Sequence, residues 1–172
     1  GINLLRHGEM SIALNDWNPA VLDQAKIVVL NAPRRPVTAD EFRDLRRLME
    51  RGGTVILGCG FLDAGGCQEL LKPLGLAITG VPLGRFFDKP AFGAPVSFMS
   101  AWALDKELPQ NAKILCAYDA DRPLMVSVPV GKGQFVLIGD SEFLHNRNLE
   151  GHKNHDPANT AFLKTLFDST TR

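Results

Sequence analysis

A run of polar side chains after residue 139 is the feature of this sequence best suited to chemistry. The preceding segment, 133–139, is largely apolar and contains β-branched residues, which predicts a buried strand. The positions that follow it hold groups able to bind or react: Asp140, Ser141, Glu142, His145, Asn146 and Asn148. Because ligands of open α/β sheets collect where strands end, we expect a site at this point.

Cys59 is the candidate nucleophile, because it follows a predicted strand over 54–58 and precedes a predicted short helix. A cysteine attacks only when a helix N-terminus or an imidazole lowers its pKa. His145, His152 or His155 would supply the imidazole if the segment after the last strand folds back over the sheet edge. With Glu142, these residues give the candidate catalytic set Cys59, His145 and Glu142. The alternative, which we favour, is a cysteine that only packs at a strand end.

The same polar cluster permits binding without catalysis. Asp140 or Ser141 would cap a helix predicted over 141–149, and a helix N-terminus at a cleft attracts anionic or hydroxyl-bearing ligands. The predicted ligand-binding residues are Asn31, Gly60, Asp140, Ser141 and Asn146. Five aromatic side chains could line a ligand groove or a partner surface, or pack in the core: Trp17, Phe86, Phe87, Phe92 and Trp102.

Metal, cofactor and nucleic-acid functions find no support in the composition. The histidine spacing fits no metal-ligand pattern, and the three cysteines form no Cys-x-x-Cys motif, so we predict no metal site and no cofactor. The 19 basic and 19 acidic residues cancel, which argues against nucleic acid as a partner. A cluster of arginines over 34–51 is better explained as the solvated face of a helix.

The sequence also bears on membranes and compartment. No apolar run approaches the roughly 18 residues that a bilayer requires, so this segment is not expected to insert into a membrane. A chain that begins at Gly1 suits an excerpt of a longer protein, whose other segments would decide an extracytoplasmic or membrane-associated location. The compartment therefore stays open.

The elements that must position these residues follow from periodicity. A strand over 26–31, expected to be buried on both faces, a helix that starts at a Thr38–Glu41 capping box, and the strand over 54–58 form a parallel crossover. Strands over 112–118, 124–130 and 134–139 follow, the last two joined by a hairpin turn at 131–133, and a helix starts at 156–157. Residues 80–95, dense in Gly and Pro, predict a long loop, and 2–14 suits a helix followed by a strand. We predict one α/β domain over 1–172.

The order of these elements resembles the class I glutamine amidotransferase-like superfamily. The resemblance is carried by the segments 27–33, 48–57 and 131–144, with Asn159 downstream. It implies a three-layer flavodoxin-like sandwich with a mostly parallel central sheet and an antiparallel hairpin near the C-terminus. Within the superfamily, the chain looks most like non-catalytic bacterial domains of unknown function and the related domain of gliding-motility and intraflagellar-transport proteins.

The sequence departs from the catalytic members of that superfamily. Their nucleophile lies in a Gly-x-Cys-x-Gly elbow, whereas Leu57 and Phe61 occupy the glycine positions around Cys59. Catalytic members also have a His-x-Glu pair. In this chain Glu142 could be its glutamate, but Asp140 occupies the position of the histidine. A carboxylate cannot take and return a thiol proton near neutral pH as an imidazole does.

These observations favour a non-catalytic amidotransferase-like binding or interaction module in a larger bacterial, envelope-associated protein. Its partners would be other domains of the parent protein or a separate protein, with a small polar ligand as a further expectation. Two alternatives stay open. One is a divergent cysteine hydrolase or amidotransferase that uses Cys59 to cleave amide or ester bonds. The other is a carbohydrate- or small-metabolite-binding domain.

Overall fold

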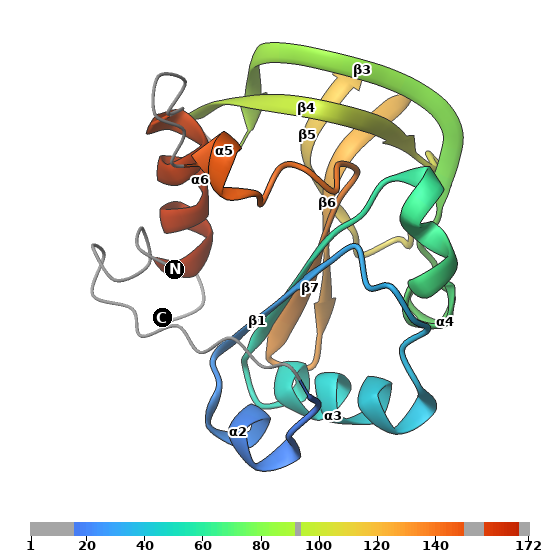
Figure 1. The fold of residues 1–172 in the computed structure, drawn as a ribbon, viewed down its shortest axis with the longest axis vertical. Helices are drawn as coiled ribbons and strands as arrows, with labels where there is room; N and C mark the ends of the chain where they lie inside the picture. The colour runs from blue at the N-terminus through green and yellow to red at the C-terminus, as the bar shows by residue number, and fades with distance from the viewer. Residues whose placement is uncertain (1–15, 92–93, 150–156, 169–172) are drawn as a thin grey trace.

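The computed structural model describes residues 16–91, 94–149 and 157–168. At its centre is a five-stranded mixed sheet with the order β1-β2-β7-β6-β5 (Figure 1). Three strands run parallel: β1 (Ile27–Asn31), β2 (Thr54–Gly58) and β7 (Gly133–Ile138). The sheet continues with β6 (Arg122–Val130), which is antiparallel to β7, and β5 (Lys113–Asp119), which is antiparallel to β6. A separate antiparallel pair, β3 (Ile78–Ala91) and β4 (Ala94–Leu104), arches over one end of the main sheet.

The first crossover confirms the sequence prediction. After the short helix α2 (Pro19–Gln24), β1 leads into α3 (Ala39–Glu50) and then into β2, which pairs with β1 in parallel. The capping box at Thr38 and Glu41 forms in both directions and fixes the start of α3. The expectation that β1 is buried on both faces is wrong, because β1 is the edge strand and Val29 is 46% exposed.

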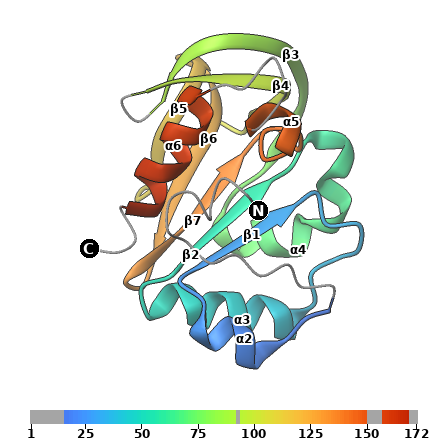
Figure 2. The ribbon, with the colours of Figure 1, turned by 60° about the vertical axis from the view of Figure 1, so that its left-hand side comes forward.

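The main sheet is covered on both faces, and the alternation along its strands divides the core in two. Val55 and Leu57 of β2 belong to the cluster that includes α3 and α4 (Gln68–Leu71), whereas Ile56 belongs to the opposite cluster. That second cluster is closed by α6 (Pro157–Asp168) and by β4, whose Phe98 is fully buried (Figure 2). In a doubly wound fold, helices cover both faces of the sheet. Here the hairpin strand β4 covers part of one face.

The predicted flavodoxin-like three-layer sandwich is wrong. The chain is α/β, but its five-stranded sheet is mixed, it has few helices, and a second, two-stranded sheet is present. The physical reason lies in the connections. Two strands joined by a tight turn must pair antiparallel, so the meander β5-β6-β7 adds two antiparallel pairings to the sheet and needs no crossover helices. Gly131, at φ +60°, makes the turn between β6 and β7 as predicted.

Residues 80–95 are not a loop but belong largely to the β3–β4 hairpin. Their glycines and prolines are accommodated by register shifts, which occur on either side of Pro82 and Gly84. Gly84 has φ +74°, a left-handed conformation that glycine adopts without strain. Bulges of this kind let a strand bend and carry residues that a regular ladder would exclude.

The helices near the site are shorter than predicted. The helix expected over 141–149 is reduced to α5 (Asn146–Leu149), because 141–145 form turns. After β2 the chain forms two 3₁₀ helices, η1 (Phe61–Gly66) and η2 (Lys72–Leu74), on either side of α4. The elements predicted over 2–14 and the predicted cap Asp156 lie outside the described residues. Within the described ranges, no helix is long and apolar enough to cross a membrane.

Acid should weaken the fold at the start of α3. Glu41 is buried and accepts hydrogen bonds from the Arg35 guanidinium and from the backbone N–H of Thr38. The hydrogen bond from Arg35 is the main reason that the pKa of Glu41 falls from 4.5 to about 2, against the opposing effect of burial. The folded state therefore binds this proton less readily than the unfolded chain. The stabilisation is present above pH 4.5 and is lost as the pH falls towards 2.

We expect Glu41→Gln to lower the free energy of unfolding by about 1–2 kcal/mol at pH 7, since Arg35 is largely exposed and solvent screens the pair. At pH 2 the variant and the natural protein should differ little. Urea titrations at both pH values measure this. Glu50→Gln is the control, because the Glu50–Arg46 pair is exposed on both sides. An equal deficit at both pH values would contradict the assignment.

Candidate functional site

The parallel strands bring the sequence-predicted residues to one edge of the sheet. Gly58 of β2 is paired in register with Asn31 of β1 and with Ile138 of β7. Cys59 and Asp140 therefore lie just beyond the ends of two neighbouring strands. The Cys59 N–H donates to the Ile138 carbonyl at 3.0 Å. Packing here is tight, because a Cβ on Gly58 would lie 2.7 Å from Asn31 Oδ1. The structure therefore places Asn31, Cys59 and Asp140 at the same edge of the sheet.

Asp140 clamps the hairpin to the end of β7. Its side chain is fully buried, and Oδ2 accepts from the N–H groups of Met99 (2.7 Å) and Ser100 (3.0 Å), while Oδ1 accepts from the N–H of Glu142 (2.8 Å). Burial raises the pKa of Asp140, and the backbone N–H donors around it oppose that rise. With both oxygens engaged by the backbone, the carboxylate joins β4 to β7. It does not cap a long helix as the sequence suggested.

Asn159 makes a second clamp on the same hairpin. Its amide exchanges two hydrogen bonds with the backbone of Ser97, at 2.8 Å and 3.0 Å, and the side chain is fully buried. Asn159 therefore ties α6 to β4, a strand that the sequence did not predict.

Cys59 is a buried thiol rather than an exposed nucleophile. Its side chain is fully buried, and its Sγ lies 3.4 Å from the Gly60 carbonyl and 3.3 Å from Cys67 Sγ. The contact with Cys67 and burial together raise the pKa of Cys59 far above its usual value. Over the described residues, these contacts connect Cys59 to no imidazole. His152 and His155 lie outside the described residues.

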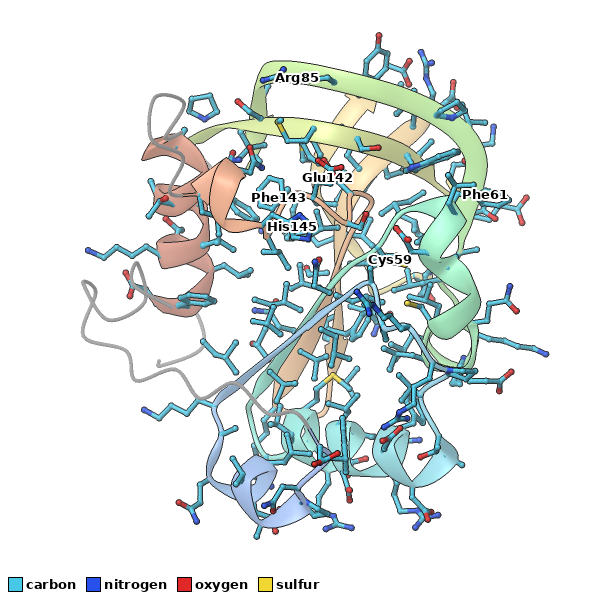
Figure 3. The ribbon with its side chains drawn as sticks, in the orientation of Figure 1. Cys59, Phe61, Arg85, Glu142, Phe143 and His145 are labelled. Atoms are coloured by element: carbon cyan, nitrogen blue, oxygen red, sulfur yellow. The ribbon has the colours of Figure 1, made fainter. Side chains whose placement is uncertain are left out.

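The other candidate residues lie near this edge without forming a triad with Cys59. Figure 3 shows Cys59 at the end of β2 and Glu142 and His145 on the segment after β7. Glu142 and Ser141 are half-buried, His145 is exposed, and Asn146 begins α5. A catalytic role for Cys59, His145 and Glu142 stays a prediction. So does ligand binding by Asn31, Gly60, Asp140, Ser141 and Asn146.

An exposed apolar patch lies beside this edge, and the sequence signalled only one of its members. We define the Phe61 patch as Phe61, Leu62, Val81 and Trp102. Phe61 is 45% exposed, Leu62 81% and Val81 47%. The ring of Phe61 packs on that of Trp102 at 5.6 Å between centroids, and lies over Gly80. A second signal in the sequence could have indicated the patch. Phe61 and Leu62 are adjacent apolar residues between glycines, and they belong to no helical pattern that would predict their burial.

The other aromatic residues named in the sequence analysis do not extend the patch. Trp17 donates its indole N–H to Asp44 at 3.0 Å and packs against the α3 side of the core. The side chains of Phe86, Phe87 and Phe92 lie outside the described part of the structure. Among the described residues, no group of three or more His, Cys, Asp or Glu side chains could hold a metal ion.

Fold and site together define a mixed α/β domain with a backbone-clamped carboxylate and an exposed apolar patch. The chain belongs to the family described as a domain of unknown function, DUF4350, whose model matches residues 4–166. A search of curated proteins finds no match.

Solved structures share the fold at low sequence identity. The mmIFT52 N-terminal domain has a TM-score of 0.74 and 16% identity over 98% of this chain and 87% of its own. The cytoplasmic protein STM3548 from Salmonella typhimurium has a TM-score of 0.64 and 12% identity, over 98% and 85%. A β-galactosidase from Halorubrum lacusprofundi has a TM-score of 0.56 and 21% identity over 86% of this chain but only 22% of its own.

These findings correct the family resemblance inferred from the sequence. The family model and the neighbouring structures point to DUF4350 and to the mmIFT52 N-terminal domain, and nothing points to the class I glutamine amidotransferase-like superfamily. Each segment that carried the resemblance contains a short apolar strand, a pattern that many sheets share. The specific motif around Cys59 lacked both glycines and the histidine.

Proposed function

We propose that this domain is a non-catalytic interaction module that docks another domain of a longer parent polypeptide through the Phe61 patch. The observation that carries the proposal is the exposure of Leu62, at 81%, beside a stacked Phe61 and Trp102. Contiguous exposed apolar side chains on a folded domain mark sites of interaction. Aromatic anchors such as these supply much of the binding free energy in protein interfaces.

The choice of another domain as the occupant rests on how this fold is used elsewhere. In the Halorubrum lacusprofundi β-galactosidase, the matched region is 22% of the chain, and in an exo-β-1,4-mannosidase from an Opitutaceae bacterium it is 26%. In such chains the fold has further segments of the same polypeptide around it. A covering domain would remove the Phe61 patch from water, at roughly 25 cal/mol for each Å² of apolar surface buried.

The geometry of Cys59 supports the non-catalytic part of the proposal. A nucleophilic cysteine must be a thiolate near neutral pH, and the raised pKa of Cys59 keeps it protonated. Both oxygens of the neighbouring carboxylate, Asp140, accept backbone N–H groups, three in all, as a structural clamp does.

Hydrogen exchange in the full-length parent polypeptide tests the docking. We expect Leu62→Ser to speed amide exchange at 61–63 and 80–82 by at least about tenfold, because losing one interface anchor costs more than about 1 kcal/mol. Ile114→Ser is the matched control, since Ile114 is 47% exposed on β5 and lies outside the patch. Equal exchange in Leu62→Ser and the natural protein would contradict docking here. Release of ammonia or hydrolysis of an ester that disappears in Cys59→Ser would contradict the non-catalytic assignment.

A further inference from the structure

Two buried cysteines face each other beneath η1. Cys59 follows β2 and Cys67 follows η1, and their sulfur atoms are 3.3 Å apart. Both residues are fully buried, and neither forms a disulfide in the structure. The third cysteine, Cys116 on β5, belongs to the other core cluster. The function proposed above uses none of the three.

We propose that Cys59 and Cys67 are a redox-modification site, in which the two thiols are converted reversibly into an intramolecular disulfide. The sulfur atoms need only approach from 3.3 Å to the roughly 2.05 Å of a disulfide bond. The two residues are also close in sequence, with only 60–66 between them, so a link would not have to pull distant elements together.

The segment that covers the pair is built to open locally. Residues 61–66 form the 3₁₀ helix η1, which has no side-chain cap, and 3₁₀ hydrogen bonds have poorer geometry than those of an α-helix. Leu62 projects into solvent, and a Cβ on Gly65 would meet nothing within 4 Å. A segment with few buried contacts opens at a lower free-energy cost than the core strands do. Opening it exposes both sulfur atoms together.

The two thiols differ in the way that disulfide exchange requires. The contact with Cys59 lowers the pKa of Cys67 against the effect of burial, whereas Cys59 stays protonated. In the exchange that we propose, Cys67 attacks and Cys59 resolves. The oxidant we invoke is a small-molecule disulfide such as oxidised glutathione.

The exchange balances in two steps. The Cys67 thiolate attacks one sulfur of oxidised glutathione, which breaks that S–S bond, forms a mixed disulfide and releases one glutathione thiolate. Cys59 then gives its proton to that thiolate and attacks Cys67 Sγ, which breaks the mixed disulfide and releases the second glutathione. Counting the proton that Cys67 releases when it ionises, the protein loses two protons and two electrons overall, and these reduce one glutathione disulfide to two thiols.

Thiol counting after equilibration of the whole chain with glutathione redox buffers tests the proposal. We expect the oxidised protein to lose two of its three thiols, and peptide mapping to find a Cys59–Cys67 link. Cys116→Ser should still form the link, whereas Cys67→Ser should keep both remaining thiols reduced or carry glutathione. Three thiols that stay reduced in excess oxidised glutathione, or a link that involves Cys116, would overturn the proposal. The thiol count and peptide map of the natural protein decide between these results, so a variant that folds poorly does not obscure the test. Neither result depends on docking at Leu62.

Discussion

Replacing Asp140 with alanine should lower the free energy of unfolding by about 3–5 kcal/mol, the largest loss we expect from one polar side chain. The reason is that three backbone N–H groups, of Met99, Ser100 and Glu142, donate to this carboxylate. Because the side chain of Asp140 is fully buried, water cannot readily take the place of its carboxylate as the acceptor for these N–H groups. The change would release β4 from the end of β7.

Chemical denaturation followed by far-ultraviolet circular dichroism measures this loss. Asp140→Asn keeps one side-chain acceptor and should fall between the alanine variant and the natural protein. Asp121→Asn is the control, because Asp121 is exposed and forms an ion pair with an exposed Lys106, and we expect a change below about 0.5 kcal/mol. An Asp140→Ala variant within 1 kcal/mol of the natural protein would show, against our view, that the clamp contributes little.

Replacing Gly66 with alanine should destabilise the domain by about 2–4 kcal/mol through overpacking. A Cβ at this position would lie 2.1 Å from the carbonyl oxygen of Pro33 and 3.1 Å from that of Arg35. Neither atom can rotate away, because both belong to the backbone. The Gly66 carbonyl also accepts the N–H of Val37, so a shift of this residue would disturb a second contact.

The neighbouring glycine offers a matched control. A Cβ on Gly65 would meet nothing within 4 Å, so Gly65→Ala should change stability by less than about 0.5 kcal/mol. Thermal unfolding of the two variants, measured side by side, gives the comparison. Similar melting temperatures for Gly65→Ala and Gly66→Ala would refute the close approach of η1 to the segment after β1.

The parts of the fold that the sequence predicted are those with local signals. The strand over 54–58 is fully buried and apolar, and the start of α3 carries a complete capping box. The β3–β4 hairpin escaped prediction because Pro82 and Gly84 are strand breakers unless bulges accommodate them. Whether bulges form depends on packing against the rest of the domain, which no short stretch of sequence reveals.

The strand ends named in the sequence analysis lie together in the structure, with Asn31, Cys59 and Asp140 at one edge of the sheet. The use of Asp140 as a clamp could not be foreseen, because two of its three donors lie on β4, about forty residues earlier in the chain. The Cys59–Cys67 pair was missed for a related reason, since an irregular 3₁₀ turn, not a periodic helix, brings the two sulfur atoms together.

The position of the β3–β4 hairpin in the chain affects where members of the family can differ in length. The hairpin lies between β2 and β7, which pair directly, so it is contained in a loop that the sheet already closes. The entropy of closing a loop grows only with the logarithm of its length, and each doubling costs about 0.6 kcal/mol. Relatives can therefore gain or lose residues at the hairpin tip with little effect on the pairing of β2 and β7. Length differences between family members should concentrate there, while the β2–β7 seam keeps its register.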